Sequence, residues 1–191
     1  MNFNKHSALV GEHAKLLGAS NYHWLNYTNE KLASTYANIR GKERGTRLHA
    51  YAAESIVLKQ KFPRTKKTLN MYVNDAIGFQ MVPEVVLYYS DNCFGTTDAI
   101  SRLDDVMKTG ILRIHDLKTG ILPAHMEQLY IYAALFCLEY KLKPGNLDIR
   151  ARIYQSDAIR EANPTSEIIV PIMDKIITFD KIIEKMKAEE E

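Results

Sequence analysis

Residues 111–118, with the sequence Ile111-Leu112-Arg113-Ile114-His115-Asp116-Leu117-Lys118, decide the fold that we predict for this chain. Their composition, after a turn at 108–110, indicates a β-strand. Successive side chains of a strand point to opposite faces, so Asp116 and Lys118 share one face with Leu112 and Ile114. A carboxylate in a buried strand is costly unless it meets a cation or a metal ion. The stretch therefore predicts an inner strand that carries a carboxylate and an ammonium side by side.

The segments around this strand predict a mixed α/β (α+β) fold. Residues 77–90 and 95–103 have strand composition and precede the 111–118 strand, which predicts an antiparallel meander. Residues 7–17, 21–38, 41–61 and 124–142 favour helices, and the tail from residue 174 has an amphipathic helical pattern. Two further strands are predicted at 148–154 and 167–172. We expect a single domain over 1–191, with a helical extension at 1–40, a core at 41–173 and a C-terminal helix at 174–191.

Composition restricts the class of protein only in part. The 191 residues include 46% hydrophobic residues, enough for a sizeable core, and the formal net charge of +2 neither proves nor excludes nucleic-acid binding. The two cysteines, Cys93 and Cys137, form no CxxC pair, which argues against a structural zinc or an iron–sulfur cluster. The sequence has no signal-peptide pattern and no run of 18 apolar residues, so we expect a cytoplasmic protein without a membrane span.

Three side chains predict a metal site around this strand. Asp98 follows Gly95 on the preceding strand, and neighbouring strands lie about 4.8 Å apart, so Asp98 and Asp116 can reach one ion. Hard carboxylate oxygens favour Mg²⁺ or Mn²⁺, and the imidazole of His49 can complete the set. Glu84 is an outer candidate. The alternatives are a turn role for Asp98, a buried core histidine at position 49 and an ion pair between Asp116 and Lys118.

Other polar residues are candidates for contacts with a substrate. Lys118 can orient an attacking water and stabilise negative charge on a phosphate. Gln128 and Tyr132 stand four residues apart on a predicted helix and therefore face the same way, which suits either core packing or a phosphate contact. Lys66 and Lys67 belong to a basic stretch at 59–67 that forms either a phosphate-binding surface or a solvated loop.

The order of four segments resembles a known family. GTRLH at 45–49, GTTD at 95–98, DLKTG at 116–120 and QLYIY at 128–132 occur in the order found in the RecB-type exonuclease branch of the PD-(D/E)XK nuclease superfamily, which includes mitochondrial and phage-encoded exonucleases. The resemblance covers about half of the chain. It implies a restriction-endonuclease-like core with a central mixed sheet flanked by helices. It also implies that His49, Asp98 and Asp116 bind Mg²⁺ or Mn²⁺, that Lys118 is catalytic, and that Gln128 and Tyr132 form the family's QxxxY pair.

Three functions follow as expectations. The first is a metal-dependent DNA exonuclease that acts in recombination, replication or DNA turnover, encoded by a phage and active in the host cytoplasm if the phage resemblance holds. The second is a structure-specific or restriction-type endonuclease, or an RNA nuclease, of the same chemistry. The third is a nucleic-acid-binding module that keeps the fold without catalysis. All the residue types required for catalysis are present, which favours an enzyme.

Overall fold

The strand predicted at 111–118 forms an inner strand of a five-stranded mixed sheet. The strands are β1 (Val82–Ser90), β2 (Cys93–Leu103), β3 (Gly110–Leu117), β4 (Leu147–Gln155) and β5 (Ala158–Ala162), and they are paired in this order. All neighbours are antiparallel except β3 and β4, which run parallel with helix α3 (Glu127–Glu139) between them in sequence. The predicted meander and the mixed α/β class are confirmed.

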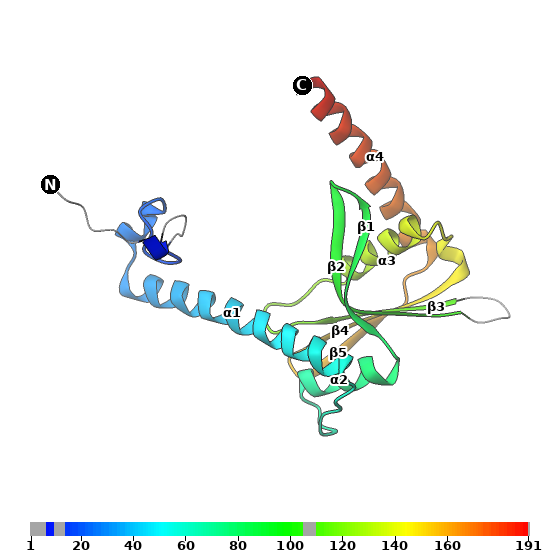
Figure 1. Cartoon of the computed structure of the whole chain (residues 1–191), viewed down its shortest axis with the longest axis horizontal. Coiled ribbons are helices and arrows are strands. Elements are labelled where there is room, and N and C mark those ends of the chain that lie inside the picture. The colour runs from blue at the N-terminus through cyan, green and yellow to red at the C-terminus, as the bar shows by residue number, and fades with distance from the viewer. Residues whose placement is uncertain (1–6, 10–13, 105–109, 191) are drawn as a thin grey trace. The chain divides into compact units, whose positions relative to one another are not determined.

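Residues 7–9, 14–104 and 110–190 are described in this computed structural model (Figure 1). They fall into two compact units, Met1–Arg47 and Leu48–Glu191. The first unit contains two short 3₁₀ helices, η1 (Ser7–Leu9) and η2 (Tyr22–Asn26), and the beginning of helix α1 (Asn29–Val57). The separate helices predicted at 21–38 and 41–61 are wrong, because α1 runs through Gly41 and Gly45. Each glycine costs about 1 kcal/mol relative to alanine, which is too little to end a long helix.

Helix α2 (Thr68–Gly78) was not predicted, and the strand expected from residue 77 begins only at Val82. The helix has a recognisable pattern, because Leu69, Tyr72, Val73 and Ala76 recur at helical spacing and face the core. Its first N–H, from Thr68, donates to Asp157 Oδ1 at 2.8 Å, from the two-residue turn between β4 and β5. This long-range cap is a contact that no local pattern could indicate.

Within the second unit, three helices end in the same way. Lys59, Gln80 and Lys141 follow α1, α2 and α3, each with φ of 54°. At each end, two backbone N–H groups return to carbonyls of the last turn, as Gln60 N does to Ser55 O at 2.9 Å. This is the Schellman arrangement, which glycine usually supplies. Non-glycine residues in this left-handed conformation are strained, so the surrounding packing holds them there.

The core lies on both faces of the sheet. On one face, α3 and α4 (Ser166–Glu190) cover buried residues that include Leu112, Ile114 and Ile153. On the other face, the end of α1 and all of α2 cover a second cluster around Ala99, Leu117 and Tyr154. The predicted arrangement of helices flanking a sheet is therefore present.

The strand predicted at 167–172 is wrong, because these residues belong to α4. The strand that pairs with β4 is β5, joined by Ser156 and Asp157, which both have positive φ and form a tight hairpin turn. Ile169 is fully buried, and Ile172, Met173 and Ile176 pack beside it. This helical spacing outweighs the β-propensity of the isoleucine and valine residues.

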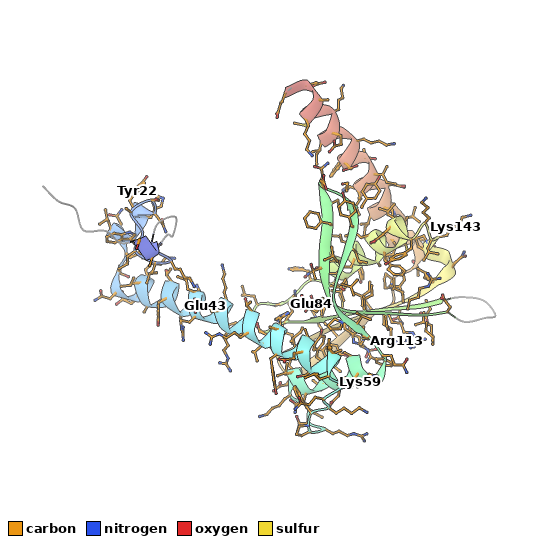
Figure 2. All side chains as sticks on the ribbon, viewed as in Figure 1. Tyr22, Glu43, Lys59, Glu84, Arg113 and Lys143 are labelled. Carbon is orange, nitrogen blue, oxygen red and sulfur yellow. The ribbon has the colours of Figure 1, made fainter. Side chains whose placement is uncertain are left out.

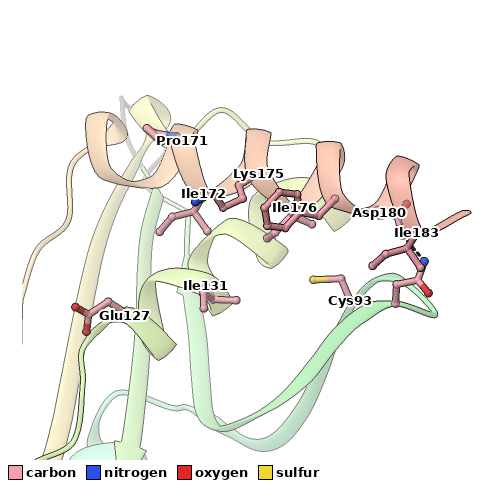
Figure 3. Close-up of a pocket in the computed structure, with 11 residues that line it drawn as sticks. Cys93, Glu127, Ile131, Pro171, Ile172, Lys175, Ile176, Asp180 and Ile183 are labelled. Carbon is pink, nitrogen blue, oxygen red and sulfur yellow. Dashed lines mark hydrogen bonds between the residues drawn. The ribbon is translucent and has the colours of Figure 1, made fainter. Parts of the chain in front are cut away.

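An apolar cavity of about 570 Å³ borders α4 (Figure 3). Ile131 of α3, Ile176 and Phe179 of α4, and Cys93 at the start of β2 line it. Among the described residues, no helix has the length and apolar character to cross a membrane.

Candidate metal centre

Asp116 and Lys118 meet at the carboxyl end of β3. Lys118 Nζ lies 3.1 Å from Oδ1 and 3.0 Å from Oδ2 of Asp116. Asp116 is buried, and its Oδ2 has no hydrogen-bond partner among the described residues, because Lys118 is close enough for an ion pair but is not aligned for a hydrogen bond to that atom. The predicted shared face is therefore present. One buried carboxylate oxygen, Oδ2 of Asp116, is left able to accept a hydrogen bond or to bind a metal ion.

Asp98 links the neighbouring strand to this end of β3. Its Oδ2 accepts a hydrogen bond from the backbone N–H of Leu117 at 2.7 Å, and its Oδ1 lies 3.2 Å from Nδ1 of His49. The backbone pairing Ala99↔His115 brings this part of β2 against the end of β3. His49 reaches the site from α1, one turn before Ala52, which packs in the core. Asp98 is thus a bridge between α1 and the end of β3.

Glu84 completes a group that is able to hold a metal ion. One ligand atom each from His49, Glu84 and Asp98 lies within 4.8 Å of the others. Glu84 is in β1 after Pro83, and its φ of 54° is rare for a non-glycine residue in a strand. Strained backbone of this kind occurs at ligand sites. Figure 2 labels this glutamate at the base of the β1–β2 hairpin.

This group differs from the predicted ligand set of His49, Asp98 and Asp116. It contains Glu84, which the sequence suggested only as an outer candidate, while the carboxylate of Asp116 is held by Lys118. A histidine nitrogen and two carboxylates offer three ligand atoms that could hold a metal ion. The residues therefore fit a metal ion, and the ligand role of Asp116 stays a prediction.

A chain of hydrogen bonds connects Lys118 to β2 through α3. Lys118 Nζ donates to Gln128 Oε1 at 2.9 Å, Gln128 Nε2 donates to Tyr132 Oη at 3.1 Å, and Tyr132 Oη donates to the carbonyl of Thr96 at 2.7 Å. Gln128 and Tyr132 are four residues apart on α3 and face the same way, as predicted. Lys118 is therefore oriented from two sides, by Asp116 and by Gln128.

Burial and charge set the protonation of these groups. Burial, followed by the charge of Asp98, raises the pKa of Asp116 above its usual range, while Lys118 acts in the opposite direction. The hydrogen bond to Asp98 raises the pKa of His49, and partial burial opposes this effect. A cation bound here would favour the charged carboxylates and the neutral imidazole.

Two residues near the site were missed at the sequence level. Tyr72, on the unpredicted α2, is buried, and burial together with the charges of Asp98 and Asp116 raises its pKa, so the phenol stays protonated. His115 precedes Asp116 in β3. Burial lowers the pKa of the His115 ring to about 3, which keeps the ring neutral. Its Nδ1 lies 3.2 Å from the hydroxyl of Tyr154. The helical spacing of residues 69, 72, 73 and 76 is the signal that could have placed Tyr72.

Lys66 and Lys67, the predicted phosphate contacts, are not part of the metal-binding group. Both are exposed and lie in the segment between α1 and α2. The structure therefore brings together His49, Glu84, Asp98, Asp116, Lys118, Gln128 and Tyr132, and places the two lysines elsewhere.

The comparisons with known proteins add no relative: no protein-family model, no curated protein and no solved structure matches this chain. The fold and the site thus define a mixed α/β protein with a group of acidic and histidine side chains suited to a metal ion.

Proposed function

We propose that this protein is a divalent-metal-dependent nuclease that hydrolyses phosphodiester bonds of DNA from a chain end. One observation carries the proposal: the group of His49, Glu84 and Asp98 and the Asp116–Lys118 pair converge at one end of β3. Hydrolysis of a phosphodiester needs stabilisation of negative charge and an oriented water, and these residue types supply both.

The protonated side chain of Lys118 has a defined part in this chemistry. An ammonium has three N–H donors, and here Asp116 and Gln128 accept from two of them. The third donor remains for the attacking water or for a non-bridging phosphate oxygen. Water bonds to phosphorus and gives up a proton, while the P–O bond to the leaving oxygen breaks and that oxygen takes up a proton. The charge that develops on the phosphate oxygens is stabilised by this positive group.

The carboxylates and His49 would hold the ion. When bound, Mg²⁺ or Mn²⁺ supplies a Lewis acid that polarises the phosphate and lowers the pKa of bound water. The hydrogen bond from Leu117 N–H holds the Asp98 carboxylate in place before an ion arrives. The line of bonds through Gln128 and Tyr132 holds Lys118. Preorganised donors avoid reorganisation during the reaction.

The test compares four DNA substrates with Mg²⁺ or Mn²⁺ and with EDTA: linear and closed circular, each single- and double-stranded and of identical sequence. We expect shortening of linear DNA only, and no reaction in EDTA. Cleavage of intact circles would replace the exonuclease with an endonuclease of the same site. Absence of hydrolysis in every substrate, with both metals, would overturn the proposal.

A further inference from the structure

Positive charge is concentrated between α1 and α2. Residues 59–67 contain five cations, Lys59, Lys61, Arg64, Lys66 and Lys67, and no acidic residue. The whole chain has a net charge of +2, so the remainder has a net charge of −3 (2 − 5 = −3). None of the five forms an ion pair with a described residue, whereas Arg102, Arg150 and Arg152 each pair with a carboxylate. The segment therefore presents a concentration of positive charge without ion pairs among the described residues.

Three of these cations line a cavity of about 590 Å³. Lys61, Arg64 and Lys66 come from the segment, and Met71, Asn74 and Gly78 come from α2. The acidic residue in the lining, Asp75, is already engaged: its Oδ2 accepts from Arg152 at 3.0 Å and from the Tyr154 hydroxyl at 2.7 Å. The unpaired charge in this cavity is therefore positive, and it suits an anion.

The segment is held in place by two asparagines of α2. Asn74 exchanges two hydrogen bonds with the backbone of Phe62, at 2.9 Å and 3.0 Å. Asn70 Nδ2 donates to the carbonyl of Pro63 and to Thr65 Oγ1, both at 3.0 Å. These bonds fix the backbone that carries the cations, which lowers the entropy lost when a ligand binds.

Five cations within nine residues exceed what one phosphate needs. Lys59 and Lys67 stand at the two ends of the segment in sequence and do not line the cavity, so the positive charge of the segment extends beyond the cavity lining. Figure 2 labels Lys59 at the start of this segment. An extended polyanion matches this distribution better than a single anion does.

We infer that this segment and α2 form a cradle for the sugar-phosphate backbone of a nucleic-acid strand. The inference rests on the proposed function and assigns it a binding surface apart from the metal ligands. His49 lies eight residues before Val57, the last residue of α1, which corresponds to about 12 Å of helix. The cradle segment begins at Lys59, two residues after the end of the helix that carries His49, so one helix links the cradle to the metal group.

The test measures binding without catalysis. Fluorescein-labelled single-stranded and duplex DNA are titrated with the full chain in EDTA across a range of salt concentrations. The variant Lys61→Gln/Arg64→Gln/Lys66→Gln removes the cavity cations. The matched control Lys141→Gln/Lys143→Gln/Lys181→Gln removes the same charge from exposed positions outside the cradle. A second variant, Lys59→Gln/Lys67→Gln, removes the two flanking cations.

We expect the cavity variant to flatten the slope of log affinity against log salt by about 2 for single strands and about 2.7 for duplex DNA, because each phosphate contact releases about 0.7 or 0.9 counterion. At 0.1 M salt the single-strand affinity falls about 100-fold. The flanking variant loses about 1.4 of slope on single strands, and the control keeps the wild-type slope. An unchanged slope in the cavity variant, or an equal loss in the control, would overturn the cradle.

The outcome is independent of hydrolysis. Salt slopes of this kind in EDTA, together with no cleavage of DNA with Mg²⁺ or Mn²⁺, would support the cradle and contradict the proposed nuclease activity. Cleavage of DNA by the wild type, together with wild-type DNA binding by the cavity variant, would support the nuclease activity and contradict the cradle.

Discussion

Gly95 lies against the ring of Tyr132, so that a Cβ at this position would be 3.0 Å from Tyr132 Cε1. The ring has little freedom to withdraw, because its hydroxyl donates to the Thr96 carbonyl and accepts from Gln128. Gln128 in turn holds Lys118. The absence of a side chain at position 95 therefore positions Lys118 indirectly.

Replacement of Gly95 by alanine should disturb this arrangement. We expect Gly95→Ala to lower the free energy of unfolding by about 1–3 kcal/mol, the usual effect of overpacking, and to reduce DNA hydrolysis. Denaturant unfolding and nuclease rates measure the two effects. Gly145→Ala is the control, because a Cβ there meets nothing within 4 Å. Equal unfolding free energies and equal nuclease rates of the two variants would show that the Tyr132 ring moves away from residue 95 without cost.

Replacement of Asp116 by asparagine should abolish hydrolysis without loss of the fold. The two side chains have the same shape, and a buried carboxylate whose pKa is raised by burial contributes little stability of its own. We expect the rate to fall at least about 100-fold, more than changes in groups behind metal ligands cause. Asp148→Asn, which weakens the exposed ion pair with Arg150 outside the metal group, should keep full activity. A wild-type rate in Asp116→Asn would remove Asp116 from the site.

Replacement of Lys118 by methionine should separate catalysis from metal binding. Methionine keeps the aliphatic length of the side chain and removes the charge beside Asp116. We expect kcat to fall by about 100- to 1,000-fold, as for other groups that stabilise developing charge, while calorimetry shows Mn²⁺ binding retained. Loss of Mn²⁺ binding would show instead that Lys118 maintains the ligand geometry.

We expect the strained backbone at Glu84 to lower the free energy of unfolding without metal, while its carboxylate contributes to metal binding. Glycine adopts a φ of 54° without steric strain, whereas glutamine in this conformation is strained. In EDTA we expect Glu84→Gly to be more stable than Glu84→Gln by about 1 kcal/mol. Both should reduce the rise in Tm that Mn²⁺ causes in the wild type. Equal stability of the two variants in EDTA would mean that the backbone at position 84 relaxes.

The cap of α2 by Asp157 should make stability depend on pH. The backbone N–H and hydroxyl of Thr68 hold the pKa of Asp157 below its ordinary value. A carboxyl whose pKa is lower in the folded state stabilises the protein above its unfolded pKa, near 3.9, and this contribution is lost as pH falls through the folded value. Asp157→Asn should therefore be less stable than wild type at pH 7, and the difference should shrink below about pH 4. Thermal unfolding between pH 3 and 7 measures it, and a constant difference would contradict the charge-based cap.

The sequence by itself determined the features that depend on neighbouring residues. The shared face of Asp116 and Lys118 follows from the two-residue period of a strand. The common direction of Gln128 and Tyr132 follows from the helical period. The β1–β2–β3 meander follows from short connections between strand-forming runs, which leave antiparallel neighbours as the simplest arrangement. Each of these was predictable because its geometry is set within one or two adjacent elements.

Only the tertiary structure decided which distant residues meet. Glu84 joins His49 and Asp98 from another strand, at a residue of β1 whose backbone is left-handed. Residues 167–172 are helical although their local propensity favours a strand, because burial of Ile169 against α3 and the sheet stabilises the helix more than β-propensity disfavours it. The ligand group thus depends on contacts between residues up to 49 positions apart in sequence (98 − 49 = 49), and these contacts form only when the helices pack on the sheet.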